Sequence, residues 1–246
     1  MLKPLGMIIL LIFAIACKKD EQTSVGFMMK AVETHAPVNS SNQQPPEVSD
    51  NVDHLQLDWS TAWIYITRLQ LIAEYYGISA IDGKNKYPDF TYEWQGIQKI
   101  DLLKEPRIFA TMELPEGVFK HLELTMTSQV FGTRDDPNFF LSGHYGPMIG
   151  GVPISVLVTQ EFEMNFVYNE GDEISTDEGE IFKSMVEVSL DQVFEGITPR
   201  ELDQAELTDG WLIISQDHNT GLYEKILSNL TGKHWDSMTW QIHYAN

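Results

Sequence analysis

The sequence predicts a mainly β protein, an antiparallel β-sandwich with short helices in its C-terminal section. Three observations predict this fold. Strand-sized runs of alternating or apolar residues recur along the chain, and Gly, Pro, Asn and Asp separate them at short intervals. Only from about residue 191 does the pattern become partly helical.

Composition supports a folded protein with an acidic surface. Of 246 residues, 43% are apolar and 11% aromatic, which is enough to build a core. Acidic residues number 36 against 16 basic ones, and the pI is near 4.5. Such a surface repels phosphate, so nucleic acid is not an expected partner, and neither are anionic lipid headgroups. It is compatible with calcium.

The first expected strand covers residues 25–33, which include two Met, one Phe and two Val. A disordered polar insertion follows at about 36–53, rich in Pro, Ser, Asn and Gln. The alternative is that all of 18–53 is a stalk. The apolar residues favour the strand.

The longest apolar segment, 55–76, is rich in β-branched and aromatic residues, which favours a strand over a helix. Trp63 and Leu69 share one parity with Thr67, while Ile64 and Ile66 lie on the other, so its early part is expected to be buried on both faces. Asp82-Gly83 then predicts a hairpin-type turn.

Residues 118–127 carry the clearest half-buried alternation, with Leu122, Leu124 and Met126 facing one way. Further short elements are expected at 90–94, 99–103, 107–114, 139–141, 154–159, 161–168 and 182–190.

Helical signals follow in the C-terminal section. Thr198, Pro199 and Glu201 match a helix start with a capping box. Residues 220–230 place apolar side chains at i, i+4 and i+8, which predicts an amphipathic helix. The aromatic end, 235–244, is expected to form a last strand or to pack on the sheet.

Residues 1–16 have the charged start, apolar middle and small final residues of a signal peptide, and the apolar run is too short to span a membrane. The residue that follows, Cys17, is the only cysteine. This arrangement resembles the lipobox of bacterial lipoproteins and implies lipidation of Cys17. The alternative is a conventional signal peptide with an incidental cysteine, which would leave a lone thiol in an exported chain.

The residues after the cysteine, Lys18, Lys19, Asp20 and Glu21, resemble the signal that sends Bacteroidetes lipoproteins to the outer face of the outer membrane. The alternative is a charged, solvated tether. We therefore expect a lipidated tether over 17–24, which acyl chains such as palmitate would anchor, and a β-sandwich domain over 25–246.

A second resemblance covers about half the chain. Residues 100–103 (IDLL), 114–124 (LPEGVFKHLEL) and 152–154 (VPI) are similar to a family of uncharacterised Bacteroidetes-type lipoprotein domains. That family is usually described as a transthyretin- or fimbrillin-like β-sandwich of unknown function. The chain departs from it by Phe119 in place of a tyrosine, and by His121 and Glu123 near the usual arginine. The resemblance implies a surface accessory, adhesive or binding domain.

Catalytic signatures are absent from the sequence. It contains no G-x-S-x-G and no H-E-x-x-H, and its seven histidines are scattered. One carboxylate pair, Glu161 and Glu163, would share a strand face at about 7 Å, within the range of glycosidase carboxylates. Acidic residues are so abundant that chance also produces such pairs.

Calcium is the better metal hypothesis, because hard cations prefer clustered oxygens. The acidic loop that could supply them holds Asn169, Glu170, Asp172, Glu173, Asp177, Glu178 and Glu180. A weaker fragment of an EF-hand pattern, 217–221, has Ser228 where the bidentate glutamate would stand. The alternative is a solvated acidic loop for the first segment and a turn leading into a helix for the second. No other cofactor is expected.

Two surface features remain. The six tryptophans (Trp59, Trp63, Trp94, Trp211, Trp235 and Trp240) could include a sugar-stacking platform, although most are expected in the core. Asp236-Ser237-Met238 resembles a Bacteroidetes O-glycosylation motif, which would require an exposed Ser237.

Together these features predict an outer-membrane, surface-exposed lipoprotein that is not an enzyme and binds glycan or a surface protein. Two alternatives stay open. One is a hydrolase acting on extracellular polysaccharide. The other is a fimbria-like subunit with residues 25–33 as an exchangeable edge strand.

Overall fold

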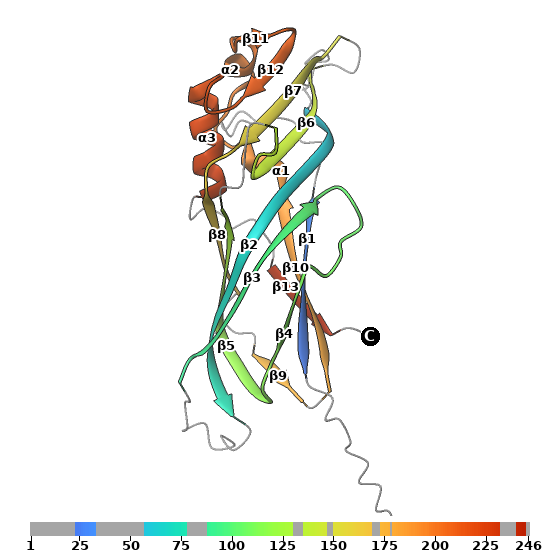
Figure 1. The fold of residues 1–246 in the computed structure, drawn as a ribbon, viewed down its shortest axis with the longest axis vertical. Coiled ribbons are helices and arrows are strands. Elements are labelled where there is room, and N and C mark those ends of the chain that lie inside the picture. Colours follow the sequence, from blue (N-terminus) through green and yellow to red (C-terminus); the bar gives the residue numbers. More distant parts are fainter. Residues whose placement is uncertain are drawn as a thin grey trace, which may run out of the picture.

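The computed structural model describes residues 23–32, 57–77, 88–129, 135–146, 150–168, 173–177, 179–231 and 240–244. Within these ranges the protein is mainly β, as predicted (Figure 1). The predicted leader, Cys17, the export signal and the polar insertion lie outside the described residues.

The described strands are thirteen in number and the helices three. The strands are β1 (Ser24–Val32), β2 (Leu57–Gly77), β3 (Phe90–Asp101), β4 (Ala110–Glu113), β5 (Gly117–Ser128), β6 (Phe139–Tyr145), β7 (Val152–Val158), β8 (Phe162–Val167), β9 (Ile174–Thr176), β10 (Ile181–Ser189), β11 (Leu207–Thr208), β12 (Trp211–Ile214) and β13 (Trp240–Tyr244). The helices are α1 (Leu190–Val193), α2 (Pro199–Asp203) and α3 (Thr220–Thr231).

The strands form two sheets. The smaller has the order β13-β10-β1-β4. The larger follows β11-β12-β7-β6-β2-β5-β8, with β3 also paired to β2 and β9 to β5. The prediction of purely antiparallel sheets is wrong, because β1 runs parallel to β10 and β12 runs parallel to β7. Alternation along a strand shows which face is buried but not the direction of its neighbours, so the sequence pattern could not reveal this.

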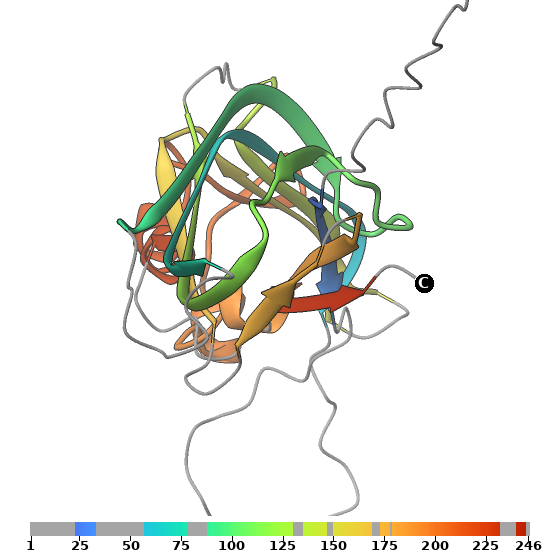
Figure 2. The same cartoon turned by 90° about the horizontal axis from the view of Figure 1, so that it is seen from below.

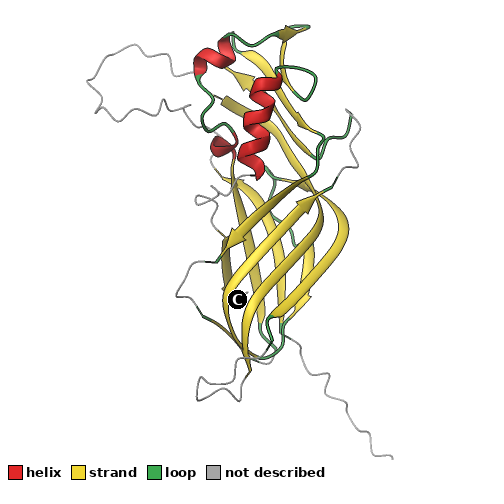
Figure 3. Cartoon of the chain, turned by 90° about the vertical axis from the view of Figure 1, so that its left-hand side faces the viewer, coloured by secondary structure: helices red, strands yellow, loops and turns green. Residues whose placement is uncertain are grey.

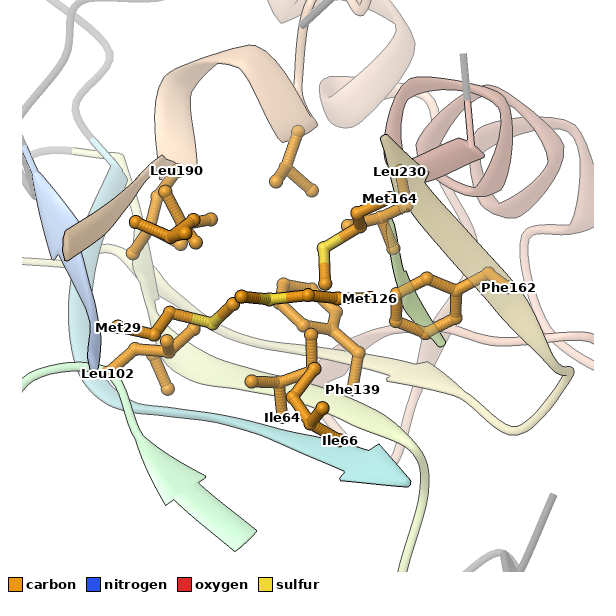
Figure 4. Packing of buried hydrophobic residues seen from close by; sticks show 14 of the residues in the cluster. Met29, Ile64, Ile66, Leu102, Met126, Phe139, Phe162, Met164, Leu190 and Leu230 are labelled. Carbon is orange, nitrogen blue, oxygen red and sulfur yellow. The ribbon is translucent and has the colours of Figure 1, made fainter. Parts of the chain in front are cut away.

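The molecule is elongated, and its two halves cover the large sheet differently (Figures 1 and 3). In the lower half, where β4, β5 and β9 lie, the two sheets enclose the interior (Figure 2). In the upper half, helices cover one face of β6, β7 and β12 (Figure 3). Figure 4 shows side chains of β1, β2, β5, β6, β8, α1 and α3 packing together where the halves meet.

The long strand β2 passes through both halves, and its buried side changes along the way. Ala62, Ile64 and Ile66 are buried, and after a register shift against β3 between Ile66 and Arg68 the buried set becomes Thr67, Leu69, Leu71 and Ala73. A β-bulge has this effect, because one extra residue moves every later side chain to the other face. The mixed parity of the segment thus reflects bulges rather than burial on both faces.

The other predicted elements are largely confirmed. The segment 25–33 corresponds to β1, which settles the choice between strand and stalk in favour of the strand. In β5, Leu122, Leu124 and Met126 are all buried. The element predicted separately at 99–103 is different, because β3 continues into it and ends at Asp101.

Both predicted helices are present. The capping box of α2 is complete: the Thr198 N–H donates to Glu201 Oε2 at 3.0 Å, and the Glu201 N–H donates to Thr198 Oγ1 at 3.3 Å. The apolar stripe of α3 places Leu222, Ile226 and Leu230 in the core. The last strand, β13, occupies the second half of the predicted 235–244 segment.

Candidate functional site: the open face of the upper sheet

Among the elements that the structure describes, no helix covers one face of the upper half of the large sheet. Side chains on the helix side of β7 and β12, such as Ile154, Val156 and Leu212, are fully buried. Their neighbours on the other side are partly or largely exposed. We call this surface the open face and define it by its outward residues: Trp211, Ile213, Pro153, Ser155, Leu157, His144, Ser142, Phe140, Thr61 and Trp63.

The outermost row of the open face consists of three ring side chains. His144 is paired with Pro153, and the parallel register that sets Leu212 beside Ile154 places Trp211 beside Pro153. We call Trp211, Pro153 and His144 the ring row. Neighbouring strands lie about 4.8 Å apart, so the row spans roughly 10 Å. Trp211 is 43% exposed, and among the described residues no ring or cation stacks on it.

Trp211 is held by a tight hairpin between β11 and β12. The turn residues Asp209 and Gly210 both have positive φ, 52° and 80°, and Thr208 pairs with Trp211 across them. Two positive φ values identify a type I′ turn, for which Asp-Gly is a preferred sequence. Leu207, which opposes the buried Leu212 in this hairpin, lies on the helix side instead and is 50% exposed.

A single side chain ties the hairpin to the start of α3. Asn219 Nδ2 donates to the carbonyl oxygens of Glu206 and Ile213 at 2.9 and 2.8 Å, and its Oδ1 accepts from the Glu206 N–H at 2.9 Å. Asn219 itself has φ of 52°, a conformation that Asn tolerates better than most residues. The aromatic side chain of Trp211 therefore rests on a fixed support.

The second row of the open face carries hydroxyl groups. Ser155 is paired with Ser142, and Ser142 with Thr61; we call these three residues the hydroxyl row. The row lies two residues along the strands from the ring row, about 7 Å away. An extra residue in β2, Ser60, donates to the Ser142 carbonyl at 3.1 Å.

The third row of the open face consists of Trp63, Phe140 and Leu157, and two of these residues belong to an aromatic cluster. Trp63 stacks on Phe140 with ring centroids 5.4 Å apart, and Lys99 Nζ lies 3.5 Å from the Trp63 centroid. Lys99 also pairs with Asp136 at 3.2 Å. Since an ammonium group already occupies one face of its indole, Trp63 is a poorer platform than Trp211.

The carboxylate in this cluster is held in its charged form. Asp136 accepts hydrogen bonds from Tyr65 Oη at 2.9 and 3.1 Å, and these, together with Lys99, lower the pKa of Asp136. Partial burial and the neighbouring carboxylate raise the pKa of Tyr65. Both groups thus keep their ordinary charge states at neutral pH.

The remaining tryptophans behave mostly as predicted for core residues. Trp59 and Trp240 are buried, and Trp94 is half-buried with an edge contact to Phe109. Trp235 lies outside the described residues, as does Ser237.

The calcium hypothesis for the acidic loop stays a prediction. Asn169, Glu170, Asp172 and Glu178 lie outside the described residues. Glu173 pairs with Lys120, and the Asp177 N–H donates to Glu180 Oε2 at 2.9 Å. Within the described ranges, no three His, Cys, Asp or Glu side chains gather in a way that could hold a metal ion.

The weaker candidates are not brought together. Asn219 of the EF-hand-like fragment is engaged by backbone groups, as described above. Glu163 lies on β8 and accepts from Thr127 Oγ1 at 3.4 Å, whereas Glu161 precedes the strand. Of the predicted pair, Glu163 thus lies within the strand and Glu161 is the residue directly before it.

Sequence reasoning missed the open face as a unit. The Asp209-Gly210 turn was a readable hairpin signal that would have placed Trp211 next to a tight turn. His144 and Pro153 carried no such signal, because they meet Trp211 only through sheet register.

No protein-family model matches the chain, and no curated protein matches it. Within the part of the chain that the structure describes, none of the helices has both the length and the apolar character needed to cross a bilayer.

Proposed function

We propose that this protein is a lipoprotein of the outer membrane, anchored through Cys17 and facing the exterior, whose open face binds glycans without catalysis. The open face is the observation that carries the proposal, because it combines an exposed, rigidly supported indole with neighbouring hydroxyl groups. Aromatic rings contact the apolar faces of sugars while short polar groups orient them, and few other ligands need both.

The position of the open face suits display from a membrane. Ser24 begins β1 at the lower end of the molecule, where its N–H donates to the Glu180 carbonyl, and the β11–β12 hairpin lies at the opposite end (Figure 1). Only five residues separate Cys17 from Thr23, so an extended tether would reach about 20 Å. The lower end would then stay near the bilayer, and the open face would lie toward the far end of the molecule.

Two of the three carboxylates near the open face, Asp136 and Asp101, support a binding role over a hydrolase. A glycosidase needs one carboxylic acid with a raised pKa opposite a second, available carboxylate. Asp136 instead has a lowered pKa and accepts from Tyr65, while Asp101 is engaged by Lys104 at 2.7 Å and by the Leu103 N–H.

The test is a glycan array with the full mature chain carrying Cys17→Ser, in the presence and absence of calcium. Trp211→Ala should abolish the signals that the parent protein gives. Leu207→Ala is the matched control, since it removes an equally exposed side chain from the other side of the same hairpin. Equal binding by both variants would place the site elsewhere, and an array without signals would contradict the proposal.

Anchoring is tested separately in cells. The chain should incorporate labelled palmitate, and external protease should degrade it on intact cells. Cys17→Ala should abolish the label and release the protein from the membrane fraction. A labelled protein that resists protease until the cells are broken would contradict exposure on the exterior.

A second candidate function, a fimbria-like subunit, required residues 25–33 to form an exchangeable edge strand. That expectation is wrong for the position of β1, which lies between β10 and β4 and pairs with both. This alternative is tested by engineering a protease site within residues 36–53 and cutting the folded protein there. If β1 then stays bound to the rest of the protein and no polymers form, the alternative fails.

A further inference from the structure

The charges near the open face restrict which glycans it can accept. Three carboxylates lie on or beside it, Asp58, Asp101 and Asp136, and two of them already have a described cation: Lys99 pairs with Asp136, and Lys104 pairs with Asp101. Lys99 is already shared between Asp136 and the Trp63 ring. The whole chain carries a net charge of −20. Sulfated sugars and uronic acids would therefore meet net negative charge, and the two described cations are already paired with carboxylates.

The two rows of the open face match the two kinds of surface that a pyranose presents. The ring row offers flat, largely apolar contacts along roughly 10 Å, and the hydroxyl row, about 7 Å away, offers groups that both donate and accept. His144 adds an exposed imidazole beside Asp58. A ligand with an apolar face and an edge of hydroxyl groups can satisfy both rows together.

The open face is the outward side of four neighbouring strands, β12, β7, β6 and β2. One side of a sheet encloses little of any single sugar, so one ring alone would bind weakly. Several linked sugars laid across the strands would contact more than one member of the ring row. Length of the ligand should therefore matter as much as its chemistry.

We infer that the open face binds uncharged, linear oligosaccharides, with sugar rings stacked along Trp211, Pro153 and His144 and hydroxyl groups directed to Ser155, Ser142 and Thr61. This inference rests on the proposed function and specifies its ligand class. Binding strengthens with chain length until the ring row is covered, and it weakens when the ligand carries negative charge.

The experiment is calorimetric titration of the full mature Cys17→Ser chain with neutral α- and β-linked glucan oligosaccharides of two to six sugars. Carboxylated and sulfated versions of the same lengths serve as charged counterparts. We expect tighter binding with each added sugar up to a plateau. Charged counterparts should bind at least tenfold more weakly in low salt, with a gap that narrows as salt screens the repulsion.

Variants locate the contact. Trp211→Ala should weaken binding by about tenfold or more, because it removes the exposed ring, while Trp211→Phe should retain most of the affinity. His144→Ala should cost several-fold, and Leu207→Ala should change nothing. Far-ultraviolet circular dichroism and thermal unfolding of each variant show that it is folded.

The outcomes separate this inference from the proposed function. Charged glycans that bind as well as neutral ones, in a manner that depends on Trp211, would overturn the inference and leave the open face as a glycan site. Neutral binding that is unaffected by Trp211→Ala would overturn the assignment to the open face. If no oligosaccharide binds, both the inferred ligand class and the proposed glycan-binding function are contradicted.

Discussion

The two halves of the large sheet solve the problem of burial in different ways. In the lower half the second sheet covers the inner face, and β1 supplies Val25, Phe27 and Met29 to the shared core. In the upper half α1 and α3 cover that face with Leu190, Val193, Ile226 and Leu230. The described helices cover only this side of the upper sheet, and its other side is the open face.

The bulges in β2 make the two halves compatible. Register shifts occur between Trp59 and Thr61, between Ile66 and Arg68, and between Ile72 and Glu74. Each shift turns the side chains that follow to the other face of the strand. In this way β2 contributes buried side chains to the differently shaped cores of the upper and lower halves. The open face therefore depends on the same irregularities in β2 that allow the sheet to enclose the lower core.

The largest expected effect concerns the lower half. Phe27→Ala should destabilise the protein by about 3–5 kcal/mol, since Phe27 is only 1% exposed and truncation leaves a cavity. Denaturant unfolding measures the change. Ile97→Ala, at a side chain 57% exposed, should stay within about 0.5 kcal/mol. If Phe27→Ala lost as little unfolding free energy as Ile97→Ala, the result would contradict the burial of β1 in the core.

An intermediate effect tests how closely the strands approach in the upper half. A Cβ added at Gly143 would lie 1.9 Å from the Asp58 carbonyl oxygen, so Gly143→Ala must push β6 away from β2, at a cost of about 1–3 kcal/mol or more. The matched control is Gly221→Ala in α3, where nothing lies within 4 Å.

That control should be neutral or slightly stabilising, because Ala is the better helix former by up to about 1 kcal/mol. The strand shift caused by Gly143→Ala should also weaken ligand binding at the open face, and Gly221→Ala should not. Unchanged thermal unfolding of Gly143→Ala would contradict the close approach of the two strands.

The smallest effect concerns the helical cover. The hydrogen bond from Lys225, followed by those from the Thr198 backbone and side chain, lowers the pKa of Glu201 to about 2. A carboxyl group whose pKa is lower in the folded state stabilises the fold at pH values above its unfolded pKa. That contribution is lost as the pH falls from about 4.5 toward 2.

Glu201→Gln should therefore lower the melting temperature at pH 6 by a small amount, and the difference from the parent should vanish near pH 2. Glu224→Gln, at an exposed position of α3, is the control and should not reproduce this pattern. A difference that stays constant from pH 6 to pH 2 would contradict the assigned cause.

Much of the fold could be predicted because it depends on local patterns. Alternation identified the strand at 118–127, the capping box identified α2, and i, i+4 spacing identified α3. The site was less predictable. Trp211 was one of six candidate tryptophans, and nothing in the sequence linked it to His144 or Ser155.

The sequence by itself determined the elements: strands where apolar residues alternate, helices where caps and stripes occur, and an acidic surface that disfavours anionic partners. The tertiary structure alone decided which strands are neighbours, that two pairs run parallel, and where bulges reverse the buried side of β2. The physical reason is that alternation and capping act within a few residues of the chain. Sheet register, by contrast, joins residues as far apart as Trp63, Phe140 and Leu157, and only the folded backbone brings them into one surface.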